Sequence, residues 1–205
     1  MTVKALENLY DYGYWANRKL FDVIAQLTPE QFTQTVAGNY GSIRNTMVHV
    51  LSAEAGWLDR CGGPKRRPRL NHEDFPTVKS VIRAGNGVET NVNGFLAKLK
   101  DEDLARNVEF SFGPSEEYSM QLGELMHHAA IHGVHHRGQI SLLIRLLGHA
   151  PGNFDILLYY AEGSSLYEIN MYIALAQMIV GWLMVTAGLG RIEGAPYALL
   201  TQETI

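Results

Sequence analysis

The chain has 205 residues, of which 46% are hydrophobic and 19% are charged, a composition that excludes intrinsic disorder and suffices for one domain with a substantial core. Its formal net charge of −4 argues against general nucleic-acid binding, which requires a basic face. With Cys61 as its single cysteine it cannot form an internal disulfide, and residues 1–13 lack the apolar stretch of a signal peptide, so we expect a cytoplasmic protein.

Four long amphipathic helices are predicted in chain order. Apolar residues recur every three or four positions in residues 3–27, 43–60, 77–99 and 120–147. Ser42 is a favourable N-cap for the second helix, and Gly148, followed by Pro151, ends the fourth. With a long crossover between the second and third helices, this order predicts an all-α fold, a four-helix bundle.

Two connections have compositions of their own. Residues 64–76 are polar and proline-rich, and we interpret their basic run, residues 65–69, as a solvated loop in preference to a phosphate-binding patch. Before the fourth helix, Val108, Phe110 and Phe112 alternate with polar residues and precede a Gly113-Pro114 turn. This alternation predicts a small β-hairpin.

A C-terminal extension follows the predicted bundle. Residues 170–190 contain no charged residue and reach the length of a membrane span. Gln177, Thr186 and several small residues dilute this run, so we favour an apolar helix packed on the bundle or at a dimer interface over a membrane segment. The predicted domains are therefore residues 1–163, the bundle, and residues 164–205, the extension.

Histidines in the predicted fourth helix are the main functional signal. Five of the chain's eight histidines fall within ten positions: His127, His128, His132, His135 and His136. On a helical wheel His132 and His136 occupy the middle of the apolar stripe, His135 its edge, and His127 and Arg137 point away. Because burying imidazoles without partners is costly, and because a pair spaced i, i+4 can converge on one cation, this arrangement indicates a metal site. Core histidines that hydrogen-bond to carboxylates are the alternative.

A metal held by two histidines needs a ligand from another element. His49 lies at the edge of the apolar arc of the second helix, and facing helices of a bundle present ligands inward. We therefore prefer it to His72 and His149, which fall in a loop and at a helix end. His128 could replace His49 or act as a base.

Two further polar residues intrude on inner helix faces. Glu54 is interpreted as a partner in a structural ion pair, with a pocket carboxylate or general base as the alternative. Asn17 is expected to form a core hydrogen bond. No catalytic residue is identified by these patterns.

Three segments together resemble the DinB/YfiT-like superfamily: YWANRKL (Tyr14 to Leu20), MVHVLSAEAGWLDR (Met47 to Arg60) and HGVHHRGQISLLIRLLG (His132 to Gly148). The resemblance implies a four-helix bundle, commonly dimeric, with a divalent metal ion held by three histidines. Carried over residue by residue, those ligands are His49, His132 and His136. The resemblance does not extend to residues 166–205.

The resemblance implies a metal more directly than any reaction, because members of the superfamily are functionally mixed. The first hypothesis is a metal-dependent enzyme that activates a low-molecular-weight thiol, or water, for transfer or hydrolysis of a small-molecule substrate. The second is a non-catalytic metal-binding protein that acts in a stress response or in an interaction. The third is a bundle anchored to a membrane by residues 170–190. Imidazole suits zinc, nickel, iron and manganese alike, so the metal is not distinguished. A homodimer is expected, whereas a nucleic-acid partner is not.

Overall fold

The computed structural model of the protein describes residues 1–38, 40–63, 67–113, 116–163 and 178–179. They belong to two units, Met1–Asp155 and Ile156–Ile205. In the second unit the structure describes one helix, α6 (Ile156–Glu162), and two further helical residues, Met178 and Ile179. The predicted domain boundary at residue 163 stays a prediction, and the rest of the apolar run at residues 170–190 lies outside the described residues.

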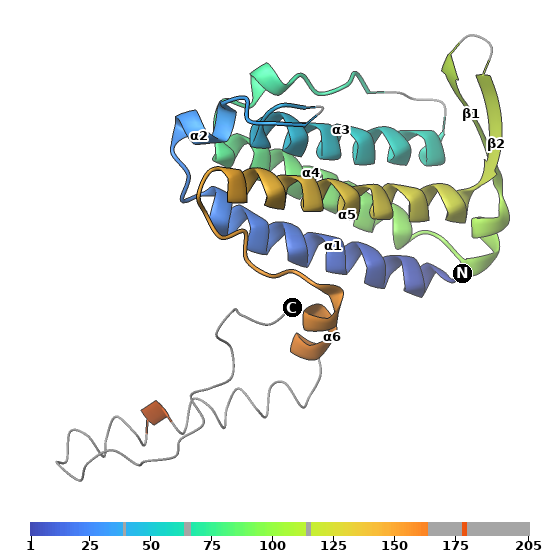
Figure 1. Ribbon diagram of the computed structural model, residues 1–205. Coiled ribbons are helices and arrows are strands. Elements are labelled where there is room, and N and C mark those ends of the chain that lie inside the picture. The colour runs from blue at the N-terminus through green and yellow to red at the C-terminus, as the bar shows by residue number, and fades with distance from the viewer. Residues whose placement is uncertain (39, 64–66, 114–115, 164–177, 180–205) are drawn as a thin grey trace. The chain divides into compact units, whose positions relative to one another are not determined.

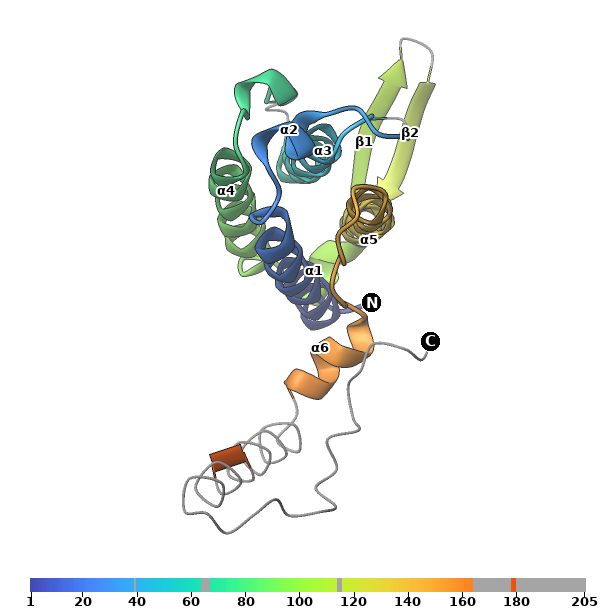
Figure 2. The same cartoon turned by 60° about the vertical axis from the view of Figure 1, so that its left-hand side comes forward.

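Four long helices form the first unit: α1 (Val3–Ile24), α3 (Ile43–Gly62), α4 (Val78–Leu96) and α5 (Leu122–Leu146). Figure 1 shows them side by side, and the view along the bundle in Figure 2 shows them around a common centre. Helix α3 packs against α4 and α5, and α1 packs against the same two helices, so α1 and α3 occupy opposite corners. The predicted all-α bundle is confirmed.

Short polar side chains set where these helices begin. Thr2, Ser42 and Thr77 are extended N-caps whose side-chain oxygens accept a hydrogen bond from a backbone N–H of the first turn. The first predicted helix was too long, because Thr28 caps a separate short helix, α2 (Pro29–Thr33), with a reciprocal hydrogen bond from its own backbone to Gln31. Helix α4 also ends before its predicted end at residue 99, at Leu96.

The predicted hairpin is present as β1 (Asn107–Gly113) and β2 (Glu116–Gln121), which pair antiparallel with Phe110 opposite Tyr118. Phe110 is buried against Trp57 of α3, with the ring centroids 5.3 Å apart. This contact holds the hairpin against one end of the bundle (Figure 1). Two short 3₁₀ helices, η1 (His72–Asp74) and η2 (Asp101–Ala105), lie in the connections on either side of α4.

The apolar core lies between the four long helices. Its fully buried side chains include Leu20 of α1, Leu51 of α3, Leu96 of α4, and Leu125 and Ile140 of α5. Burial on this scale contributes roughly 25 cal/mol per Å² of apolar surface, which makes the core the main source of stability. Within the parts of the chain that the structure describes, no helix is long and apolar enough to cross a membrane.

Candidate metal centre

Three histidines from two neighbouring helices meet inside the bundle. His132 and His136 are one turn apart on α5, and His49 lies on α3, which packs directly against α5 (Figure 2). His49 Nε2 lies 3.3 Å from His132 Nε2, and His132 Nε2 lies 3.0 Å from His136 Nε2. The three ligand atoms all fall within 4.8 Å of one another, so one ion could contact all three. The structure thus brings together the three residues that the sequence predicts as ligands.

The hydrogen bonds around His136 determine which of its nitrogens faces the cluster. Nδ1 lies 2.7 Å from Gln139 Oε1. Because an amide oxygen only accepts, Nδ1 carries the proton and Nε2 carries a lone pair. The proton in the 3.0 Å contact between His136 and His132 therefore belongs to His132 Nε2. The metal-free cluster is thus held by hydrogen bonds between imidazoles, whereas a cation in place of the His132 proton could accept the lone pairs of all three Nε2 atoms at once.

Burial keeps these imidazoles neutral. The pKa of His49 is about 4, first because of burial and then because of the positive charges of His136 and Arg69. The pKa of His132 is also about 4, first because of burial and then because of the neighbouring histidines. The pKa of His136 is lowered by burial, against the opposing effect of its hydrogen bond to Gln139. Neutral imidazole is the form that binds metal ions, so the donor set fits a divalent cation near pH 7.

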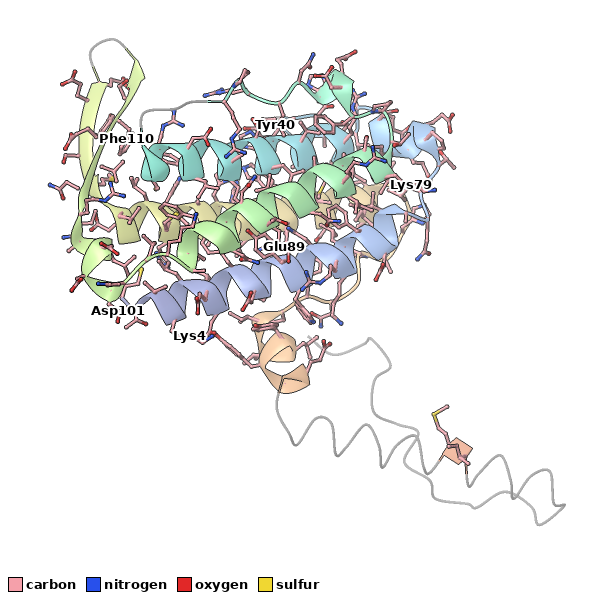
Figure 3. The ribbon with its side chains drawn as sticks, turned by 180° about the vertical axis from the view of Figure 1, so that it is seen from behind. Lys4, Tyr40, Lys79, Glu89, Asp101 and Phe110 are labelled. Atoms are coloured by element: carbon pink, nitrogen blue, oxygen red, sulfur yellow. The ribbon has the colours of Figure 1, made fainter. Side chains whose placement is uncertain are left out.

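Tyr40 is a neighbour of this cluster that the sequence analysis missed. Its hydroxyl lies 3.0 Å from His49 Nε2, and its ring stacks on the His49 ring with centroids 4.0 Å apart. Figure 3 shows it along α3, away from the end of the helix where Phe110 lies. Tyr40 precedes Gly41, whose φ of 77° belongs to a tight turn before the N-cap of α3. The sequence pattern indicates that turn but not what its side chains contact.

The other histidines do not join the three. His72 lies in η1 beside Glu73, and His149 Nε2 accepts a hydrogen bond from Gln31. His127 is exposed, as predicted, and His135 is exposed and accepts a hydrogen bond from Gln139. His128 is also exposed; its ring centroid lies 6.0 Å from that of His132, and it packs edge-on against Trp57.

A cavity of about 1020 Å³ reaches the cluster from the side of His49 and His132. Its walls include the rings of Trp57, Phe110 and Tyr118. Residues 67–69, the described part of the basic run, are exposed, in agreement with the predicted solvated loop, and they also line this cavity. Arg67 donates hydrogen bonds to the Asp59 carboxylate from its backbone N–H, its Nε and its Nη2, and the charge of Arg69 acts on His49.

A second buried polar cluster lies between α1, α3 and α5. Tyr14 donates a hydrogen bond of 2.6 Å to Glu54, and Arg137 donates one of 3.3 Å to Asn17. The attraction of Arg137 for Glu54 acts on the pKa of both groups. The structural roles predicted for Glu54 and Asn17 are therefore consistent with their surroundings.

The prediction that Arg137 points away from the core was wrong. The residue is only 4% exposed. A Cβ built on Gly133 would lie 3.1 Å from Arg137 Nη1, and one built on Gly13 would lie 3.6 Å from it. The two glycines therefore leave the space through which the long side chain turns back between α5 and α1.

Comparison with known proteins agrees with this fold. A family model described as the DinB family matches residues 1–167. The protein DinB of Bacillus subtilis (strain 168) is 24% identical over 156 residues, which cover 74% of this chain and 91% of that protein. The uncharacterized protein YizA of the same strain is 25% identical over 163 residues, covering 80% of this chain and 98% of that protein. A crystal structure of a DinB-like protein from Bacillus cereus ATCC 10987 is similar in fold, with a TM-score of 0.62, 22% identity, and coverage of 74% of this chain and 97% of that one. Because the family model spans most of its length, the chain belongs to the DinB family.

Proposed function

We propose that the protein binds one divalent metal ion through the Nε2 atoms of His49, His132 and His136. The single observation that carries the proposal is the convergence of three neutral imidazoles within 4.8 Å of one another. Three protein ligands leave at least one coordination position open, which is the arrangement of catalytic rather than structural sites. The donor set accepts zinc, nickel, iron or manganese and does not select one of them.

When bound, such an ion would act as a Lewis acid that favours the anionic form of a thiol or of water near neutral pH. We infer on this basis a metal-dependent enzyme that uses a low-molecular-weight thiol, or water, for transfer to or hydrolysis of a small substrate. No residue of the chain is assigned as the catalytic base. His128 lines the cavity and stays a candidate, whereas the contacts of Glu54 with Tyr14 and Arg137 favour a structural role.

The cavity beside the three histidines favours the enzyme over a non-catalytic metal-binding protein. A volume of about 1020 Å³ would admit a small organic substrate together with a thiol. Trp57 and Phe110 supply apolar wall, and Arg69 supplies a positive charge near His49 that favours an anionic group. A site that only stored or sensed a metal would need no such space.

Metal analysis of protein purified without a polyhistidine tag tests the metal, and two alanine variants make it specific. We expect about one ion per chain in the wild type, and less than about a tenth of that in His132→Ala. His127→Ala is the matched control, because His127 is exposed on the same helix. Equal metal content in His132→Ala and the control would refute the proposed centre.

Thiol-conjugation assays then separate enzyme from binder. The metal-loaded wild type is offered several thiols with a panel of electrophiles, and product is followed by mass spectrometry. The proposal expects turnover by the wild type and none by His132→Ala. A protein that binds metal stoichiometrically but turns over no thiol and hydrolyses no substrate would support the non-catalytic alternative.

A further inference from the structure

Tyr40 contacts the same atom of His49 that would bind the metal. Its hydroxyl and His49 Nε2 are 3.0 Å apart. An imidazole nitrogen has one lone pair, so it cannot accept a hydrogen bond and bind a cation at the same time. Whichever of the two groups donates, a metal ion bound to His49 Nε2 would therefore end the hydrogen bond between Tyr40 and His49.

The position of Tyr40 does not depend on that hydrogen bond. Its ring stacks on the His49 ring at an interplanar angle of 20° and meets the His136 ring edge-on, with centroids 5.6 Å apart. The ring would thus stay beside both ligands after the hydroxyl lost its bond to His49. Because the residue is only partly exposed, a hydroxyl left without an acceptor would be unfavourable.

The distance also suits a group that faces the coordination sphere. Two atoms that each lie about 2.1 Å from one ion are roughly 3.0–3.4 Å apart in ordinary geometries. The separations of 3.3 Å and 3.0 Å between the histidines fall in this range, as expected for ligands of one ion. The Tyr40 hydroxyl lies 3.0 Å from one of these ligand atoms and is therefore at the edge of the coordination sphere. A hydroxyl there lies within hydrogen-bonding reach of whatever occupies an open position of the ion.

We propose that the Tyr40 hydroxyl is a fourth functional group of the centre: it donates a hydrogen bond to an anion that binds at the open position and is not itself a metal ligand. This inference rests on the proposed metal site. The residues that line the large cavity include His49 and His132, but Tyr40 is not among them. Its effect should therefore fall on the atom bound to the ion, and not on the body of a substrate in the cavity.

Cobalt-loaded protein tests the inference without an activity assay, because the visible spectrum of Co²⁺ reports both uptake of the ion and binding of azide to it. In Tyr40→Phe we expect the azide dissociation constant to rise about tenfold, since one hydrogen bond to a charged acceptor is lost. The affinity for Co²⁺ itself should stay the same or rise slightly, because His49 Nε2 no longer has to give up a hydrogen bond. Tyr12→Phe is the matched control, since its hydroxyl donates to the Phe154 carbonyl and not to a histidine.

Each other outcome overturns the inference in a distinct way. An unchanged azide affinity in Tyr40→Phe would show that the hydroxyl does not reach the open position. A Co²⁺ affinity more than about tenfold weaker would make Tyr40 a ligand or a structural support of the centre. A wild-type protein that takes up no Co²⁺ would refute the proposed metal site as well, and so the two failures are distinguishable.

Discussion

The bundle buries two clusters of polar side chains, and the loss of solvation is compensated differently in each. Around Glu54, the Tyr14 hydroxyl donates a hydrogen bond to the carboxylate at 2.6 Å, and Arg137 supplies the opposite charge. Around His132 three neutral imidazoles lie 3.0 and 3.3 Å apart, with the Tyr40 hydroxyl beside His49, Gln139 hydrogen-bonded to His136, and no carboxylate in the group. Opposite charges meet in the first cluster, although Arg137 Nε has no hydrogen-bond partner there, whereas the second cluster contains only neutral imidazoles that can each offer a lone pair to a cation.

This difference is the basis on which we propose a structural role for the Glu54 cluster and metal binding for the histidine cluster. A buried ion pair offsets its desolvation by internal attraction, although its net contribution to stability is small. A cluster of neutral imidazoles contains no such pair of charges, and a cation would add metal–nitrogen bonds that the metal-free cluster lacks. Neighbouring residues of α5 contribute to the two clusters: His136 belongs to the histidine cluster, and the next residue, Arg137, belongs to the Glu54 cluster. A substitution of His136 should therefore affect mainly metal affinity, and a substitution of Arg137 mainly the free energy of unfolding.

The largest expected effect is on metal affinity in His136→Ala. Removing one of three ligands should weaken binding of Zn²⁺ or Ni²⁺ by more than about a hundredfold, beyond the 10- to 100-fold typical of residues that only orient ligands. Isothermal titration of metal-stripped protein measures this loss, with His127→Ala as the exposed control on the same helix. Binding within about threefold of wild type would exclude His136 from the centre.

Arg137→Met should reduce stability and leave metal binding intact. Losing the guanidinium leaves Glu54 buried without its opposite charge, which should lower the free energy of unfolding by about 3 kcal/mol. Stoichiometric metal binding should survive in the folded protein. Urea unfolding measures the change, and Arg145→Met, exposed on the same helix, should cost less than about 0.5 kcal/mol. If Arg137→Met instead lost metal without losing stability, the division between the two clusters would be wrong.

The sequence predicted the cluster of three histidines better than the cluster around Glu54. His132 and His136 are separated by one helical turn, so the period of the helix alone places them together. His49 follows from the arc of its helix and, by resemblance, from the motif around it. Each of these inferences concerns a short side chain on a regular helix, where position along the chain determines direction.

The errors share a different cause. A helical wheel treats every side chain as a radial vector, whereas Arg137 is long enough to turn back over Gly133 toward α1. Tyr40 was missed because it lies in a turn. A turn has no periodic residue pattern, so the contacts of its side chains depend on tertiary structure. The solvated loop predicted for the basic run agrees with the exposure of residues 67–69, but a loop position does not reveal that these residues also line a cavity.

A smaller effect is expected at Gln139, which orients His136 without touching the other ligands. Gln139→Leu removes the acceptor of the 2.7 Å hydrogen bond from His136 Nδ1 and should weaken metal binding about tenfold. Gln139→Glu keeps an oxygen at that position and should restore wild-type affinity or exceed it. His135→Ala tests the other side of Gln139, because its ring only accepts from the amide nitrogen. Equal affinities in the Leu and Glu variants would contradict an orienting role.

The last expected effect is a difference in how the stability of the two clusters responds to acid in metal-stripped protein. The pKa of His49 and of His132 is about 4 in the folded chain, below the ordinary value of 6.5 that the unfolded chain should show. The unfolded chain therefore binds more protons between these values, and stability should fall as the pH drops from 6.5 toward 4.

Glu54 should respond in the opposite direction. Burial raises its pKa in the folded chain, so the folded state retains a proton that the unfolded state has lost, and stability should rise on acidification. Urea unfolding at pH 7 and at pH 5 separates the two contributions through variants. Replacing His49 and His132 with Gln should reduce the loss of stability at pH 5, whereas Glu54→Gln should increase it. Changes of the same sign in both variants would mean that the two clusters are not electrostatically distinct.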